Sequence, residues 1–357
     1  MTMPHNHGKG TKPMISRTII AAAAVLAIGA AGAVQAAGEL NIYNWGNYTN
    51  PELIEKFSKQ YDVKVTITDY DSNSTALTKL KAGGAGFDLV APTNNYVQIF
   101  VDEGLLMESR PDQMSNFANV SERWKDVSWD PGRHYTVPWQ WGTTGMAVNT
   151  KAYSGDPNTS SIFLDPPAEL IGKINVVPEM MDVMQLAIMY VGGEPCTEDK
   201  TVLRKVRDTL MEAKPKWMSM DYGTTDKLSS GDYVATVNWN GSTFRARNNN
   251  PDVVYGYPKE GYPVWMDSMA ITSDAKNVEN AKLFLNFIME PENAALISAF
   301  ARYANGIDGS APFMPEDMKT APEIVAPEEF SAAGRFMPTC SKEAKDIYTA
   351  IWTELQK

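Results

Sequence analysis

Blocks of hydrophobic and polar residues predict alternating strands and helices in the first third of the chain. Asn50 and Pro51 supply an N-cap and a proline at the first helical position, and Pro92 stops an apolar strand. Strand, helix, strand, helix and strand in this order build a parallel sheet with helices on its faces. The expected strands are 40–44, 63–67 and 87–91, and the expected helices begin at Pro51 and span 74–82.

The second half of the chain repeats these blocks with less regularity. Strands are expected at 174–177 and 234–239, and an apolar segment lies at 269–271. One helix is expected to open at Pro178 and Glu179, and another has an apolar face that covers 281–288. Domains commonly span about 100–200 residues, so the 357 residues predict two lobes. The sequence therefore predicts an α/β fold of two lobes.

Aromatic and amide residues follow several of these strands at the positions where an open sheet places its ligands. In such sheets a ligand lies beyond the carboxyl ends of the strands. Trp45, Trp239 and Trp265 stand at strand ends or crossing segments, beside small or polar residues. A tryptophan is most often a core residue, but this clustering favours an aromatic-walled pocket. We interpret Trp139 and Trp141 as a packed connection between the lobes, with a third pocket wall as the alternative.

Two acids lie three residues apart at the start of the helix that opens near Pro178. Glu179 and Asp182 share one face of its first turn. Acids are favoured near a helix N-terminus by the helix dipole, so their spacing alone does not require a ligand.

The N-terminus is typical of a secretory signal peptide. Residues 1–36 contain basic residues without acids, then an apolar run from Ile19, then small residues ending at Ala36. The apolar run is shorter than the about 20 residues that a transmembrane anchor needs. We therefore expect cleavage, export and a periplasmic location.

Composition narrows the classes of function. The hydrophobic content of 43% and charged content of 21% are those of a folded protein. The formal charge of −11, about −14 without residues 1–36, argues against nucleic-acid binding and favours cationic partners. After residue 36 only His134 remains of the three histidines, which disfavours a clustered metal site, and no cofactor or metal is expected. Cys196 and Cys340 are disulfide candidates in an exported chain, with two free thiols as the alternative.

Five stretches of this sequence together resemble the spermidine/putrescine-binding periplasmic proteins, which are the receptors of polyamine ABC importers. The resemblance runs from about Leu40 to Tyr303, in the same order as in that family. It implies the two-lobed type II periplasmic-binding-protein fold, each lobe a mostly parallel sheet flanked by helices and joined by crossing hinge strands. The first lobe would comprise 37–145 and 266–310, and the second 146–265 and 311–357, which places both cysteines in one lobe. The stretches are 43–45, 86–92, 138–145, 239–242 and 258–268.

The resemblance also implies a ligand site without catalytic residues. An aromatic box and buried carboxylates would hold a cationic chain, because flat rings suit its methylene linkers and carboxylates suit its amines. Hinge closure around the polyamine would present a monomeric receptor to its membrane permease. The implied ligand-binding residues are Trp45, Tyr48, Thr93, Asn95, Glu179, Asp182, Trp239, Ser242, Trp265, Asp267 and Tyr303.

The sequence departs from the family pattern at some positions. Gly46 and Asn47 replace a hydroxyl residue and an often acidic one, and the polar contact from the C-terminal segment has no clear equivalent near Pro338. Ser242 matches the spermidine type, whereas putrescine-preferring relatives carry an acid there. Three alternatives stay open: a receptor for another small organic cation, a periplasmic hydrolase with paired carboxylates, and a scaffold or adhesin whose aromatics form only core.

Overall fold

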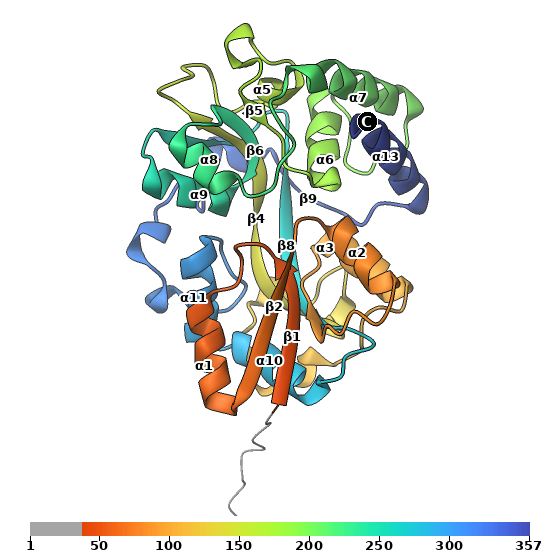
Figure 1. Ribbon diagram of the computed structural model, residues 1–357, viewed down its shortest axis with the longest axis vertical. Coiled ribbons are helices and arrows are strands. Elements are labelled where there is room, and N and C mark those ends of the chain that lie inside the picture. Colours follow the sequence, from red (N-terminus) through yellow and green to blue (C-terminus); the bar gives the residue numbers. More distant parts are fainter. Residues whose placement is uncertain (1–37) are drawn as a thin grey trace, which may run out of the picture. The chain divides into compact units, whose positions relative to one another are not determined.

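The structure is a computed structural model that describes residues 38–357, and the expected signal peptide at 1–36 lies outside these residues. It is a mixed α/β fold (Figure 1). The strands are β1 (Gly38–Trp45), β2 (Val63–Tyr70), β3 (Leu89–Val90), β4 (Thr136–Asn149), β5 (Ile174–Asn175), β6 (Ala235–Trp239), β7 (Val253–Gly256), β8 (Tyr262–Ile271) and β9 (Gly334–Phe336). The α-helices are α1 (Pro51–Tyr61), α2 (Asn73–Lys81), α3 (Asn94–Asp102), α4 (Glu122–Lys125), α5 (Ser161–Leu164), α6 (Met180–Tyr190), α7 (Lys200–Ala213), α8 (Thr224–Ser230), α9 (Asn240–Asn249), α10 (Val278–Ile288), α11 (Pro291–Ala301), α12 (Glu328–Ser331) and α13 (Lys342–Leu355).

The first strands form the predicted parallel sheet. β1 pairs in parallel with both β2 and β3, with α1 and α2 as the connections between them. The predicted N-cap of α1 is confirmed, because the Asn50 side chain accepts a hydrogen bond from the Glu52 amide at 2.9 Å. Leu53 and Phe57 are the buried side chains on the apolar face of α1. The strand–helix alternation therefore predicted this part of the fold correctly.

Two long strands, β4 and β8, connect the two halves of the sheet. Along the sheet the strands follow the order β2-β1-β3-β8-β4-β6-β5, with β7 paired to β4 and β9 to β8. β4 pairs with β8 over its first part and with β6 and β7 over its last part. Figure 1 shows both strands running through the middle of the sheet. We call the part built on β1, β2 and β3 the first lobe and the part built on β5, β6 and β7 the second lobe.

Strand directions in the second lobe differ from the expectation of a mostly parallel sheet. β5 and β6 are parallel, but β4 pairs antiparallel with β6, β7 and β8. The reason is that β4 runs on from its pairing with β8 into the second lobe, where it lies antiparallel to β6 and β7. A shift of register between Pro138 and Gln140 interrupts their ladder, at a residue that has no amide hydrogen to donate. The lobe boundaries expected from the sequence stay a prediction, because the described residues form a single compact unit.

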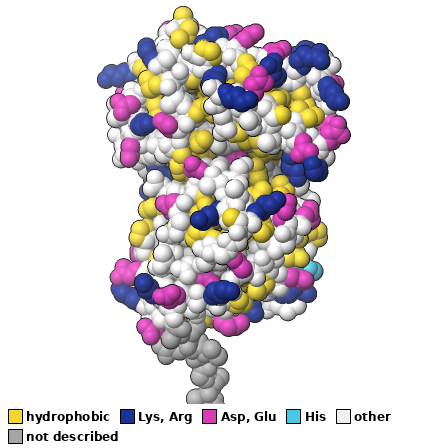
Figure 2. Space-filling model, turned by 45° about the vertical axis from the view of Figure 1, so that its right-hand side comes forward, with side chains coloured by type: hydrophobic (Ala, Val, Ile, Leu, Met, Phe, Trp, Pro, Cys, Tyr) yellow, Lys and Arg dark blue, Asp and Glu magenta, His cyan; other side chains and the backbone are white. Residues whose placement is uncertain are grey.

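The surface carries charges of both signs. On the face shown in Figure 2, acidic and basic side chains are interspersed and do not gather into one patch. Among the described residues, no helix combines the length and the apolar character that crossing a bilayer requires.

Trp139 is buried in β4, and Trp141 in the same strand packs against Trp124 and donates its indole N–H to the Asn305 carbonyl at 3.2 Å.

Candidate ligand-binding site

A pocket lies where β1, α2, α3, α6, β6, α9 and β8 meet. Every residue that the sequence singled out for ligand binding lines it, from both lobes. The structure thus brings together side chains separated by more than 200 positions, such as those of Trp45 and Tyr303. The lining residues are Trp45, Gly46, Tyr48, Asn73, Thr93, Asn95, Glu179, Asp182, Tyr222, Trp239, Ser242, Arg245, Trp265, Asp267, Tyr303 and Met337.

Three tryptophans form aromatic walls whose indole N–H groups are all bonded to the protein. Trp45 donates to the Ala91 carbonyl at 3.0 Å, and Trp265 donates to Thr144 Oγ1 at 3.1 Å. Trp239 donates to Asp182 Oδ2 at 2.7 Å, and its ring centroid lies 6.4 Å from that of Trp45. These bonds fix the orientation of each ring, so the rings can offer apolar faces to a ligand without leaving a buried N–H unpaired.

Asp267 on β8 is a buried carboxylate held by the start of α3. Thr93, the residue before α3, donates its hydroxyl to Asp267 Oδ1 at 2.7 Å. Asn73 fixes Thr93 in turn, because its Nδ2 donates to Thr93 Oγ1 and its Oδ1 accepts from the Thr93 amide. Burial raises the pKa of Asp267 to about 7, although the Thr93 bond acts in the opposite direction. A cationic ligand would supply the positive charge that the ionised Asp267 carboxylate needs as a partner.

Glu179 and Asp182 form a second acidic group at the N-terminus of α6. Glu179 is the N-cap, accepting from the Met181 amide at 3.4 Å, which fits the helix-dipole interpretation. It also accepts from the Asn73 amide of α2 at 3.1 Å and lines the pocket. Burial raises the pKa of Glu179 to about 8, with a further increase from the negative charge of Asp182. Burial also raises the pKa of Asp182 to about 6, while the Trp239 bond lowers it.

A buried amide oxygen of the pocket is available to a ligand. Asn95 Oδ1 has no hydrogen-bond partner among the described residues, whereas the Tyr48 hydroxyl faces Asp267 and lowers the pKa of that carboxyl. A buried polar atom without a partner costs free energy, so a bound molecule that supplies one is favoured. Within residues 38–357, no group of three or more His, Cys, Asp or Glu side chains is arranged to hold a metal ion.

The prediction of the site omitted five lining residues. Tyr222, in the turn before α8, donates its hydroxyl to the Gly46 carbonyl of the first lobe at 3.0 Å. Gly46 allows this approach, because a Cβ there would lie 3.1 Å from the Tyr222 ring. Arg245 follows Ser242 by three positions on α9, a spacing that could have placed it on the same helix face. Asn73 and Met337 had no local signal, because their positions in the pocket depend on contacts distant in sequence.

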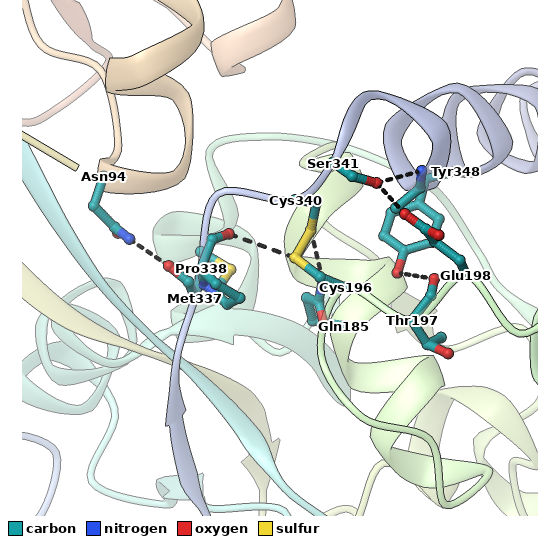
Figure 3. Close-up of a disulfide and its surroundings, with 11 residues drawn as sticks. Asn94, Gln185, Cys196, Thr197, Glu198, Met337, Pro338, Cys340, Ser341 and Tyr348 are labelled. Atoms are coloured by element: carbon teal, nitrogen blue, oxygen red, sulfur yellow. Dashed lines mark hydrogen bonds between the residues drawn. A yellow bond between two sulfur atoms is a disulfide. The ribbon is translucent and has the colours of Figure 1, made fainter. Parts of the chain in front are cut away.

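The C-terminal segment that carries Met337 runs beside a disulfide (Figure 3). Cys196 and Cys340 are joined, with their Cα atoms 5.0 Å apart. Three residues before Cys340, the Met337 carbonyl accepts from Asn94 Nδ2 of α3 at 2.6 Å. Met337 therefore lines the pocket close to the position where the sequence showed no equivalent of the family's polar contact.

Known proteins resemble this chain over most of its length. Residues 52–326 match the family model described as bacterial extracellular solute-binding protein. The spermidine/putrescine-binding periplasmic protein of Escherichia coli K12 is 32% identical over 81% of this chain and 83% of its own length. The putrescine-binding periplasmic protein of Pseudomonas aeruginosa is 29% identical over 94% of this chain and 96% of its own. The solved TpPotD lipoprotein of Treponema pallidum aligns with a TM-score of 0.77 and 26% identity, covering 89% and 99% of the two chains. With its two-lobed α/β fold and a pocket reached from both lobes, the chain belongs to the bacterial extracellular solute-binding proteins.

Proposed function

We propose that this protein binds a linear polyamine in the pocket and delivers it to an ABC importer outside the cytoplasmic membrane. The observation that carries the proposal is the convergence of three buried carboxylates with three tryptophans. The residues concerned are Glu179, Asp182, Asp267, Trp45, Trp239 and Trp265. Curated relatives named as polyamine-binding periplasmic proteins support it.

The chemistry of the pocket suits an amine with methylene linkers. Each ammonium needs a buried carboxylate or another acceptor, because an unpaired charge in a low-dielectric site is costly. The indole faces accept both the apolar linkers and the adjacent positive charges through cation–π attraction. A neutral or anionic solute would leave the three acids without partners, so such a solute should bind poorly.

Delivery in this proposal depends on closure of the lobes around the ligand. Contacts such as the Tyr222–Gly46 and Asn73–Glu179 hydrogen bonds join residues of the two lobes. A ligand that touches both lobes favours the form in which these contacts are made. The closed monomer would then dock on its permease and release the ligand without chemical change, as expected for a receptor and not for an enzyme.

Calorimetry of the exported protein tests the proposal. The ligands are putrescine, spermidine and spermine, with glycine betaine as a quaternary cation that cannot donate N–H bonds. We expect at least one polyamine to bind with a Kd of about 1 µM or lower. Binding of betaine without any polyamine would favour the receptor for another organic cation. Binding of none of them would overturn the proposed ligand class.

A further inference from the structure

Arg245 is the basic residue in a pocket whose other charged lining residues are acidic. It lies on α9, is half-buried and lines the pocket with Glu179, Asp182 and Asp267. Its Nη2 donates to Ser242 Oγ at 3.1 Å, and its Nη1 donates to the Ala301 carbonyl. A guanidinium has five N–H donors, so these two bonds leave donors available to a ligand.

Ion pairing also distinguishes Arg245 from nearby arginines. Arg247, two positions later on α9, pairs with the buried Glu323 at 2.5 Å, and Arg302 pairs with Asp317 at 2.9 Å. Among residues 38–357, no carboxylate forms an ion pair with Arg245. A guanidinium that enters a binding pocket without an acidic partner is available to an oxygen acceptor on the ligand.

Charges in the pocket are distributed unevenly. Glu179 and Asp182 lie together at α6, and the Asp182 charge raises the pKa of Glu179. Arg245 lies near the phenols of Tyr222 and Tyr303. Burial raises the pKa of both phenols, the positive charge of Arg245 opposes that rise, and the charge of Asp267 adds to it. Its guanidinium carbon is 6.0 Å from the Tyr303 ring centroid. The start of α9 adds the partial positive charge of a helix N-terminus to the same region.

We propose, building on the proposed function, that the preferred ligand is an amine with ammonium groups toward the acids and an acyl or carboxyl oxygen at Arg245. An ammonium at the Arg245 end would face a like charge in a partly desolvated site, which is unfavourable. An oxygen acceptor would instead receive charge-assisted hydrogen bonds from the unused donors. Arg245 thus selects against a polyamine that is protonated at every position along its length.

Spermidine and its two monoacetyl isomers provide a matched set of probes, because acetylation replaces one terminal charge with a carbonyl on the same chain. Ornithine tests a carboxylate as the source of the oxygen. Titration calorimetry would compare the wild type with Arg245→Met, Arg245→Lys and the control Arg123→Met. Arg123 is an exposed arginine that packs on Trp124 and Trp141 outside the pocket, so its loss changes net charge equally without touching the ligand.

We expect wild type to bind one monoacetylspermidine or ornithine about tenfold or more tighter than spermidine. Arg245→Met should reduce this preference by about tenfold or reverse it, Arg245→Lys should keep part of it, and Arg123→Met should leave it unchanged. Two results would overturn this inference while leaving polyamine binding intact. One is tighter binding of spermidine than of the other amines by wild type, and the other is a preference in Arg245→Met as large as that of wild type. If wild type bound no amine at all, the proposed function would fail as well. A melting curve of each variant checks folding, and the wild-type preference decides the matter even if Arg245→Met does not fold.

Discussion

Thr93 and Asp267, 174 positions apart, meet through a hydrogen bond of 2.7 Å that joins the start of α3 to the middle of β8. The Thr93 hydroxyl donates to a carboxyl whose pKa is raised to about 7 by burial. This arrangement keeps Asp267 in place before a ligand arrives. Because Asp267 also lines the pocket, its carboxylate can accept from an ammonium there.

Asp267→Asn should keep the fold and lose the ligand. The amide preserves shape and can still accept from Thr93, but it has no charge to meet an ammonium, and loss of one partner of a buried charge pair costs about 2–5 kcal/mol. Calorimetry with the best-binding amine would measure the loss, and a melting curve would check the fold. Asp274→Asn at an exposed acid is the control, and equal affinity in both variants would assign Asp267 a structural role.

Ligand-free stability should fall as pH rises from about 5 to about 8. Burial raises the pKa of Glu179 to about 8 and of Asp267 to about 7, above the values of about 4 in an unfolded chain. The folded state therefore binds more protons in this range, and stability is lost as pH rises through the folded pKa values. Urea denaturation at several pH values would test this.

Cation binding should show the opposite dependence on pH. An ammonium favours the ionised carboxylates, so affinity should increase from about pH 5 to about pH 8 and binding should release protons over that range. Calorimetry in buffers with different ionisation enthalpies measures the release directly. A constant affinity without proton release would contradict the buried, partly protonated state of these acids.

Tyr222→Phe should weaken closure without disturbing the pocket walls. It removes the hydroxyl that donates to the Gly46 carbonyl at 3.0 Å. It keeps the ring, whose centroid lies 5.4 Å from that of the Trp239 ring. A net hydrogen bond is worth about 0.5–1.5 kcal/mol, so affinity should fall several-fold. Small-angle scattering with and without ligand would show whether compaction is reduced. Tyr135→Phe, outside the pocket, should leave both measurements unchanged.

Removing the disulfide by Cys196→Ser with Cys340→Ser should destabilise the protein by about 2–5 kcal/mol. The cysteines are 144 positions apart, and the bond anchors the segment that carries Met337 to the pocket. Urea denaturation should show the loss. A reducing agent should lower the free energy of unfolding of the wild type but not that of the variant. Equal stability of the two proteins would mean that the bond does not constrain the unfolded chain.

Export should remove residues 1–36. The small residues that end at Ala36 match a cleavage site, so the mature chain should begin at Ala37. Intact-mass measurement of protein from the periplasm would show this. A mass that retained residues 1–36 would indicate an anchored protein.

The sequence by itself determined the local elements and the chemical character of the site. Asn50 and Pro51 predicted the start of α1, and period-two alternation predicted β2, because capping and side-chain alternation act within a few residues. The tryptophans at strand ends indicated an aromatic-walled pocket, whereas the spacing of Glu179 and Asp182 alone did not require a ligand. The resemblance then assigned these residues to one site, and all of them line it.

Only the tertiary structure decided which further residues line the pocket and how far burial shifts the pKa values of its acids. Nothing local to Tyr222, Asn73 or Met337 marks a lining residue, because each enters through a contact with a segment far away in the chain. The antiparallel crossing of β4 and β8 likewise depends on pairing between segments more than 100 residues apart. Burial, which sets the pKa of Asp267, is a property of the assembled lobes and of no single segment, and for that reason it could not be predicted from residue order alone.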